Sequence, residues 1–260
     1  MLALKLLLVP ALLAAVTLAG RRWGQRVAGW LGSFPIVAGP ILLILTLENG
    51  AAFGAEAASR ALAGVVATMG FFVLYARLAP RLAWPAALAA STAAWLALVA
   101  WLGVLPATLA ASATAALVAL LVAPLAMGAA PAHPPAAPGA APIPGAAPSR
   151  LELPARMLAG ATLVLVTSSL GARFGPEASG YAALFPVVGG TAAVFNHARQ
   201  GAGAAVTFLQ GTNRGMWSVA VFCGVLGVTL ARWPVAAAFG IALAATIVTH
   251  AITLPRTPGR

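Results

Sequence analysis

The sequence contains little charge and no aspartate. Only 7% of the 260 residues are charged, and all four acidic residues are glutamate. A soluble domain carries roughly 25% charged residues, so these side chains are too few to cover a water-exposed surface of this size. The scarcity of acids also argues against chemistry that needs clustered carboxylates, such as two-metal hydrolysis. We therefore expect lipid to cover most of the exterior.

Cysteine and histidine are also scarce, and this excludes further classes of site. Cys223 is the only cysteine, so neither a disulfide framework nor a thiolate metal site can form within one chain. His133, His197 and His250 are far apart in sequence and show no metal-ligand spacing. The net charge of +11 comes from basic residues beside apolar segments, where membrane proteins place them. We expect no catalytic residues, no metal, no cofactor and no nucleic-acid partner.

Hydrophobic residues make up 62% of the chain and gather in runs near the roughly 20 residues that a helix needs to cross a membrane. These runs predict an all-α, polytopic transmembrane helix bundle of about nine spans. We expect the spans at residues 3–20, 27–47, 55–76, 83–102, 105–127, 154–171, 178–196, 203–230 and 233–253. Residues 128–151 are rich in alanine and proline, and this composition predicts an extended, disordered loop.

The first part of the chain recurs later at a constant offset of 151 residues. The matched positions are Lys5 with Arg156, Gly20 with Gly171, Arg22 with Arg173, Gly24 with Gly175, Gly29 with Gly180, Phe34-Pro35 with Phe185-Pro186, Gly39 with Gly190, Gly64 with Gly215 and Phe71 with Phe222. Chance easily matches alanine and leucine here, but not arginine, Phe-Pro and so many glycines. We predict a duplication: a first four-helix repeat at 1–104, a connector transmembrane helix at 105–127, the loop at 128–151 and a second four-helix repeat at 152–260.

A connector that crosses the membrane once would turn the second repeat upside down relative to the first. Basic residues favour the cytoplasmic side of a membrane, so their distribution tests this arrangement. With nine spans and the N-terminus outside, ten basic residues fall inside and four outside, whereas a connector that does not cross gives seven against seven. The inside set is Arg21, Arg22, Arg26, Arg77, Arg81, Arg150, Arg156, Arg199, Arg256 and Arg260, and the outside set is Lys5, Arg60, Arg173 and Arg232. The count predicts an inverted repeat with a cytoplasmic C-terminus.

Proline and glycine interrupt the second span of each repeat at matching places. Pro35 and Gly39 lie in SFPIVAGP, and Pro186, Gly189 and Gly190 lie in LFPVVGG. Proline removes a backbone donor, and backbone groups freed in a membrane must be satisfied by protein, water or a ligand. Matched breaks of this kind indicate a transporter site. A proline kink with small residues for close helix packing explains the same pattern without a ligand.

A second set of candidate site residues occurs in the second repeat only. Arg214, next to Asn213, lies within the expected span 203–230, where a charge usually faces a cavity or a partner and where a guanidinium suits an anion. If the span starts later in the chain, near Gly211, the Arg214 side chain instead reaches the interface between membrane and water. Asn196 and His197 end the preceding span; Asn196 is a candidate solute ligand. His197 could carry a proton, or it could be an ordinary interfacial side chain.

An ion pair is predicted at the start of the third span. Glu56 and Arg60 are four residues apart in one expected helix, a spacing that brings side chains together on one face. We favour a structural role for this pair over a role as a gate.

The second repeat carries several short motifs, namely Gly180, Leu184-Phe185-Pro186, Gly201 and Gly215-Met216-Trp217-Ser218. With these motifs it resembles the GlpM-like family of small bacterial membrane proteins with about four spans. The first repeat retains Phe34-Pro35 and Gly64, but Val65-Val66-Ala67 replaces the Met-Trp-Ser run. The resemblance implies residence in a bacterial inner membrane and implies no established activity.

The architecture favours a secondary transporter or permease for a small solute bound near the midplane between the repeats. The solute is an anion if Arg214 supplies charge to the site. The alternatives are an ion channel and a non-transporting membrane factor that assists envelope or exopolysaccharide assembly; an enzyme is not expected. The expected partners are the lipid bilayer and the solute, and a homo-oligomer is compatible with the sequence.

Overall fold

The computed structural model describes residues 2–35, 37–105, 108–131 and 175–255, together with Pro154, Leu158 and Thr162. This part of the chain is helical and contains no strand. Most of the expected span at 154–171 and most of the expected loop at 128–151 lie outside the described residues.

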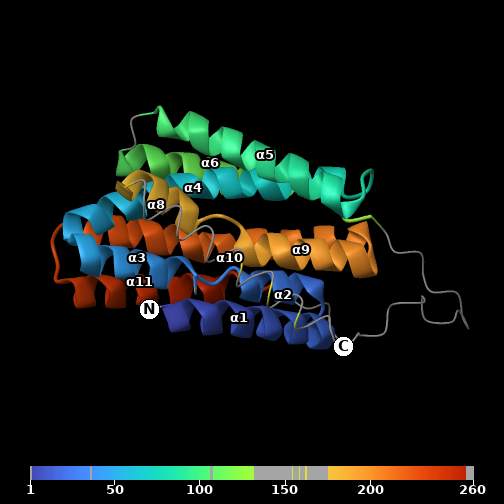
Figure 1. Ribbon diagram of the computed structural model, residues 1–260, viewed down its shortest axis with the longest axis horizontal. Coiled ribbons are helices and arrows are strands. Elements are labelled where there is room, and N and C mark those ends of the chain that lie inside the picture. The colour runs from blue at the N-terminus through green and yellow to red at the C-terminus, as the bar shows by residue number, and fades with distance from the viewer. Residues whose placement is uncertain are drawn as a thin grey trace, which may run out of the picture.

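Ten helices follow one another along the described chain (Figure 1). They are α1 (Leu2–Trp23), α2 (Gln25–Gly32), α3 (Ala38–Asn49), α4 (Ala51–Leu78), α5 (Trp84–Gly103), α6 (Leu109–Met127), α8 (Gly175–Ala183), α9 (Val187–Gln200), α10 (Ala202–Thr229) and α11 (Val235–Ile252). Gly50 separates α3 from α4, and Gly201 separates α9 from α10, with φ angles of +93° and +85°. Side chains disfavour this backbone conformation, so glycine marks both helix ends.

Five helices of the described chain are long and apolar enough to cross a membrane. They are Ala51–Leu78, Trp84–Gly103, Leu109–Met127, Val235–Ile252 and the segment Glu177–Gln200, which contains α9 and most of α8. Together with the composition, these helices indicate an integral membrane protein.

The two longest helices, α4 and α10, have 28 residues each and pack against one another inside the bundle (Figure 1). The helices α5, α6 and α11 pack onto them from outside. Each of these outer helices buries a single stripe of residues, such as Ala87, Ser91 and Trp95 of α5. Their opposite faces carry exposed apolar side chains, including Leu125 of α6 at 81% exposure, as lipid-facing helices should.

The end of α6 is held by one side chain from each long helix. Arg77 of α4 donates through Nε to the carbonyl of Ala126. Gln210 of α10 donates through Nε2 to the carbonyl of Gly128 at 2.8 Å. The last carbonyls of a helix have no partner within the helix, so these donors fix the expected connector against both α4 and α10.

Candidate functional site

Both helices that the sequence predicts to be interrupted are interrupted in the structure. The first gap separates α2 from α3 and contains Pro35, and the second separates α8 from α9 and contains Pro186. The carbonyl of Pro35 accepts the first hydrogen bond after its gap from Gly39 at 2.9 Å, and the carbonyl of Pro186 accepts from Gly190 at 2.7 Å. The helical hydrogen bonds therefore restart at two places that are 151 positions apart in the sequence.

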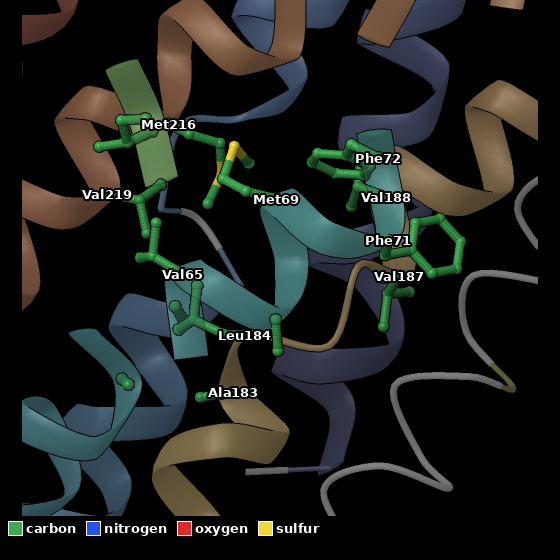
Figure 2. Packing of buried hydrophobic residues seen from close by; sticks show 14 of the residues in the cluster. Val65, Met69, Phe71, Phe72, Ala183, Leu184, Val187, Val188, Met216 and Val219 are labelled. Atoms are coloured by element: carbon green, nitrogen blue, oxygen red, sulfur yellow. The ribbon is translucent and has the colours of Figure 1, made fainter. Parts of the chain in front are cut away.

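The two breaks line one cavity of about 70 Å³. At 10–15 Å³ for each water molecule, this volume holds about five. The lining consists of Gly32, Ser33, Phe34, Pro35, Val37 and Ala38 from the first break; Ala183, Leu184, Phe185, Pro186, Val187, Val188 and Gly189 from the second; and Thr68, Phe72, Thr212, Met216 and Val219 from the long helices. Figure 2 shows the apolar side chains of this region, with Phe72, Met216 and Val188 coming from three different helices.

Three hydroxyl groups interrupt the apolar wall of this cavity. Thr68 Oγ1 donates to the carbonyl of Leu184 at 2.6 Å and thereby ties α4 to the second break. Ser33 Oγ donates to the carbonyl of Trp30 at 2.6 Å. The Thr212 hydroxyl donates a hydrogen bond to the carbonyl of Phe208 within α10. None of the described residues that line the cavity is charged.

The first half-helix of each repeat packs at backbone distance against the long helix of the other repeat. A Cβ atom on Gly29 of α2 would lie 1.9 Å from the carbonyl oxygen of Phe208 in α10. A Cβ atom on Gly180 of α8 would lie 2.4 Å from the carbonyl oxygen of Ala57 in α4. Like the two glycines, Ala57 and Phe208 are 151 positions apart. Glycine is required at both positions because any side chain would force the helices apart.

Aromatic rings also pack across the two repeats, with a ring of each repeat lying on a glycine of the other. The ring of Phe222 covers Gly39, 3.6 Å from where its Cβ would be, and the ring of Phe71 covers Gly190 at 3.4 Å. Both the rings and the glycines are related by the offset of 151 residues. Gly39 and Gly190 therefore pack beneath rings of the opposite repeat, and neither of them lines the cavity.

The phenylalanine of each Phe-Pro pair meets an aromatic ring from the last helix of the other repeat. Phe34 contacts the ring of His250 in α11 edge to face, with centroids 5.2 Å apart. Phe185 contacts Trp95 of α5 in the same geometry at 5.0 Å. Both breaks are thus braced from outside the cavity by the opposite repeat.

Arg214 lies apart from this cavity. Its side chain is exposed, whereas Thr212 and Met216 on the same helix line the cavity. Arg214 stands midway between these two residues, so the helical period turns it to the opposite side of α10. Asn213 is buried at 3% exposure and does not line the cavity. Its Oδ1 has no hydrogen-bond partner among the described residues.

His197 and Asn196, the other two candidates of the second repeat, do not line the larger cavity. The His197 Nδ1 atom lies 3.2 Å from the hydroxyl of Tyr75, and this hydrogen bond links α9 to α4. Asn196 is buried at 2% exposure and lines a second, smaller cavity. Of the predicted site residues, Pro35, Pro186 and Gly189 line the larger cavity.

The ion pair at the start of α4 joins different residues from those expected. Arg60 Nη1 lies 2.7 Å from Glu177 Oε1 of α8, while Glu56 is exposed. The prediction of a Glu56–Arg60 pair is therefore wrong, because the close approach of α8 at Gly180 brings Glu177 within reach. The Glu177 side chain is 40% exposed, so solvent screening limits the contribution of this pair to less than about 1 kcal/mol.

Sequence reasoning missed the hydroxyls of Ser33 and Thr68 in the cavity and the burial of His250 beside it. The His250 ring stacks on Trp30 with centroids 4.1 Å apart, and its Nδ1 lies 3.0 Å from Ser218 Oγ. His250 ends a stripe of buried residues at every fourth position of α11. That spacing was available in the sequence and indicates a buried histidine.

No protein-family model matches this chain, and neither a curated protein nor a solved structure is found to match it. Its function is therefore inferred from the cavity and from the helices around it.

Proposed function

We propose that this protein is a secondary transporter or permease for a small solute, which binds in the cavity between the two broken helices. The observation that carries the proposal is the convergence of both Phe-Pro breaks on one cavity. Broken helices at a repeat interface are typical of transporter sites, since unwound backbone inside a membrane persists where it lines a cavity or is buried in protein.

We further propose that the two repeats are inverted copies within a bundle of nine spans. Three observations support this. Contacts are exchanged between repeats at Gly29 and Gly180. The long helices run in opposite directions, α4 toward the end where α5 begins and α10 away from that end (Figure 1). That same end of the bundle holds the α1–α2, α4–α5 and α9–α10 junctions. These junctions carry Arg21, Arg22, Arg26, Arg77, Arg81 and Arg199, so this end is the cytoplasmic one.

The lining of the cavity favours a small uncharged solute. Apolar walls enclose it, and Ser33, Thr68 and Thr212 supply its hydroxyl groups. An anion would lose its hydration there without gaining a positive partner, because Arg214 lies on another side of α10. Rocking of one repeat against the other would expose the cavity to each side of the membrane in turn.

Filling the cavity should abolish transport. Val188 lines the cavity and is 6% exposed, so Val188→Phe would occupy space that the solute needs. We expect the wild-type protein in liposomes to take up at least one of a panel of small uncharged solutes. Val188→Phe should lose at least about tenfold of that rate, because the ring takes up volume that the bound solute needs, and extra atoms in a packed site cost about 1–3 kcal/mol.

The matched control is Leu125→Phe on the lipid-facing side of α6, where 81% of the side chain is exposed. This variant should transport like the wild type. Melting temperatures of both variants separate a blocked cavity from a misfolded protein. A wild-type protein that moves none of the solutes, or a folded Val188→Phe that transports normally, would contradict the proposal.

The GlpM-like relationship and the bacterial inner-membrane location also remain proposals. Four of the residues that carry the resemblance line the cavity: Leu184, Phe185 and Pro186 form the second break, and Met216 lies on α10. In this proposal the protein is not an enzyme, and its partners are the bilayer and the transported solute.

A further inference from the structure

A second cavity, of about 30 Å³, lies where α1, α2, α9 and α10 meet. None of its described lining residues also lines the larger cavity. Of the residues around it, Ala192 and Asn196 are buried, whereas Arg21 and Gln200 are exposed. The second cavity therefore reaches from the surface of the bundle into its interior.

The two cavities lie in line along the same helices. On α9, every fourth residue lines one cavity or the other, namely Val188 the larger cavity and Ala192, Asn196 and Gln200 the second. Residues at this spacing follow one another along one face of a helix. On α10, Thr212 lines the larger cavity, and Phe208, one turn away, lines the second. The face of α9 that borders the larger cavity thus continues through the second cavity to the exposed end of the helix.

Side-chain methyl groups separate the two cavities beside the end of α2. Gly32 and Val188 line the larger cavity, and Val16 of α1 lines the second. A Cβ atom on Gly32 would lie 3.0 Å from Cγ2 of Val16 and 3.6 Å from Cγ1 of Val188. The cavities therefore approach each other where two valines border a residue without a side chain. Because side chains rotate and helices shift on timescales faster than a transport cycle, a wall of this kind can open.

The first repeat fills the equivalent space with larger side chains. At the offset of 151 residues, Val37 corresponds to Val188 and also lines the larger cavity. Further along α3, however, Ile41 stands in the place of Ala192, and Leu45 in the place of Asn196. Alanine and asparagine occupy less volume than isoleucine and leucine, so α9 leaves room where α3 carries bulk. The hollow beyond the break is therefore a feature of the second repeat, which the shared scaffold does not require.

We propose that the second cavity is the passage through which the solute moves between the larger cavity and the end of the bundle that holds the α1–α2 and α9–α10 junctions (Figure 1). Gly32 sets the width of this passage, because any side chain there would narrow the gap beside Val16 and Val188. The inference rests on the proposed function, since it gives a route to the solute of the larger cavity. The passage itself can be tested without a known solute.

The first test compares the reactivity of single thiols at two neighbouring positions of α9. Ala192 and Ala193 are 1% and 0% exposed, but Ala192 lines the second cavity and Ala193 lines neither cavity. In a Cys223→Ala background, Ala192→Cys and Ala193→Cys would each carry the only thiol. With hydroxyethyl methanethiosulfonate, a small neutral thiol reagent, we expect purified full-length Ala192→Cys to react at least about tenfold faster, since thiols buried in packed apolar surroundings are inert.

The second test asks whether the passage leads to the larger cavity. Ala183 lines the larger cavity, and Ala183→Cys should react more slowly than Ala192→Cys because the reagent must first pass Gly32. Adding Ala192→Ile, which gives α9 the residue that α3 has, should slow the reaction at Ala183→Cys at least about fivefold, because extra atoms overfill the passage. Adding Gly32→Ala should also slow it, and Val16→Ala should restore the rate of the Gly32→Ala variant by removing the methyl group that the new Cβ meets.

Melting temperatures show which variants are folded, and the Ala192→Cys measurement decides even if Ala192→Ile does not fold. Equal rates at Ala192→Cys and Ala193→Cys would overturn the proposal. So would an Ala183→Cys thiol that never reacts, or one that reacts at an unchanged rate in folded Ala192→Ile and Gly32→Ala variants. If the thiols react as expected but no solute is transported in liposomes, the proposed function fails while the passage between the cavities stands.

Discussion

Replacing Gly29 with alanine should lower the free energy of unfolding by about 1–3 kcal/mol or more. The added Cβ would lie 1.9 Å from the carbonyl oxygen of Phe208 and 2.8 Å from the amide nitrogen of Thr212. These are backbone atoms of α10 and cannot rotate away, so α2 and α10 must separate and lose their packing. Gly180→Ala should have an effect of the same kind, because its Cβ would meet the backbone of α4 at Ala57.

Gly240→Ala provides the matched control for this prediction. Gly240 is also a helical glycine, in α11, but a Cβ there would find no atom of the described residues within 4 Å. This variant should be as stable as the wild type or up to about 1 kcal/mol more stable, since alanine favours helix over glycine. Unfolding of each variant in mixed micelles gives the free energies. Equal stability of Gly29→Ala and Gly240→Ala would contradict the close packing of α2 on α10.

Replacing Thr68 with valine should cost about 1–3 kcal/mol, although the two side chains have nearly the same shape. The Thr68 hydroxyl donates to the carbonyl of Leu184 at 2.6 Å. Leu184 lies at the break after α8, and among the described backbone hydrogen bonds none is donated to its carbonyl. Valine would therefore leave a carbonyl without a donor inside the protein, where water or lipid cannot replace the bond as bulk solvent would.

Thr114→Val on α6 is the control for the loss of the hydroxyl group itself. Thr114 is exposed, and its hydroxyl bonds only the carbonyl of Ala110 in its own helix. We expect a change within about 0.5 kcal/mol, as for other surface substitutions. The same unfolding measurement compares the two variants. If Thr68→Val proved no less stable than Thr114→Val, the proposed tie between α4 and the second break would be refuted.

The sequence predicted the helix breaks because their causes are local. Pro35 and Pro186 each remove a backbone donor, and this loss occurs wherever the neighbouring helices lie. The offset of 151 residues predicted in addition that the matched glycines and Phe-Pro pairs occupy equivalent places in the two repeats. The paired contacts of Gly29 and Gly180 follow this pattern.

The surroundings of the polar residues could not be predicted, because they depend on which helices become neighbours. Arg60 bonds Glu177 across 117 positions of the chain, and no local spacing signals such a pair. The side of α10 on which Arg214 lies could not be predicted either, because the sequence does not say which face of α10 meets α2 and α4. The hydroxyl of Thr68 gave no signal either, because threonine is common in membrane helices as a donor to its own backbone.

The inverted arrangement of the repeats is tested most directly by labelling equivalent positions from one side of the membrane. Glu48 and Arg199 are both exposed, near the ends of α3 and α9, and are related by the offset of 151 residues. In a Cys223→Ala background, Glu48→Cys and Arg199→Cys would each carry the only thiol. A membrane-impermeant maleimide applied to intact cells should label Glu48→Cys, whereas Arg199→Cys should react only after permeabilisation. Labelling of both positions from the same side would contradict the inverted repeat.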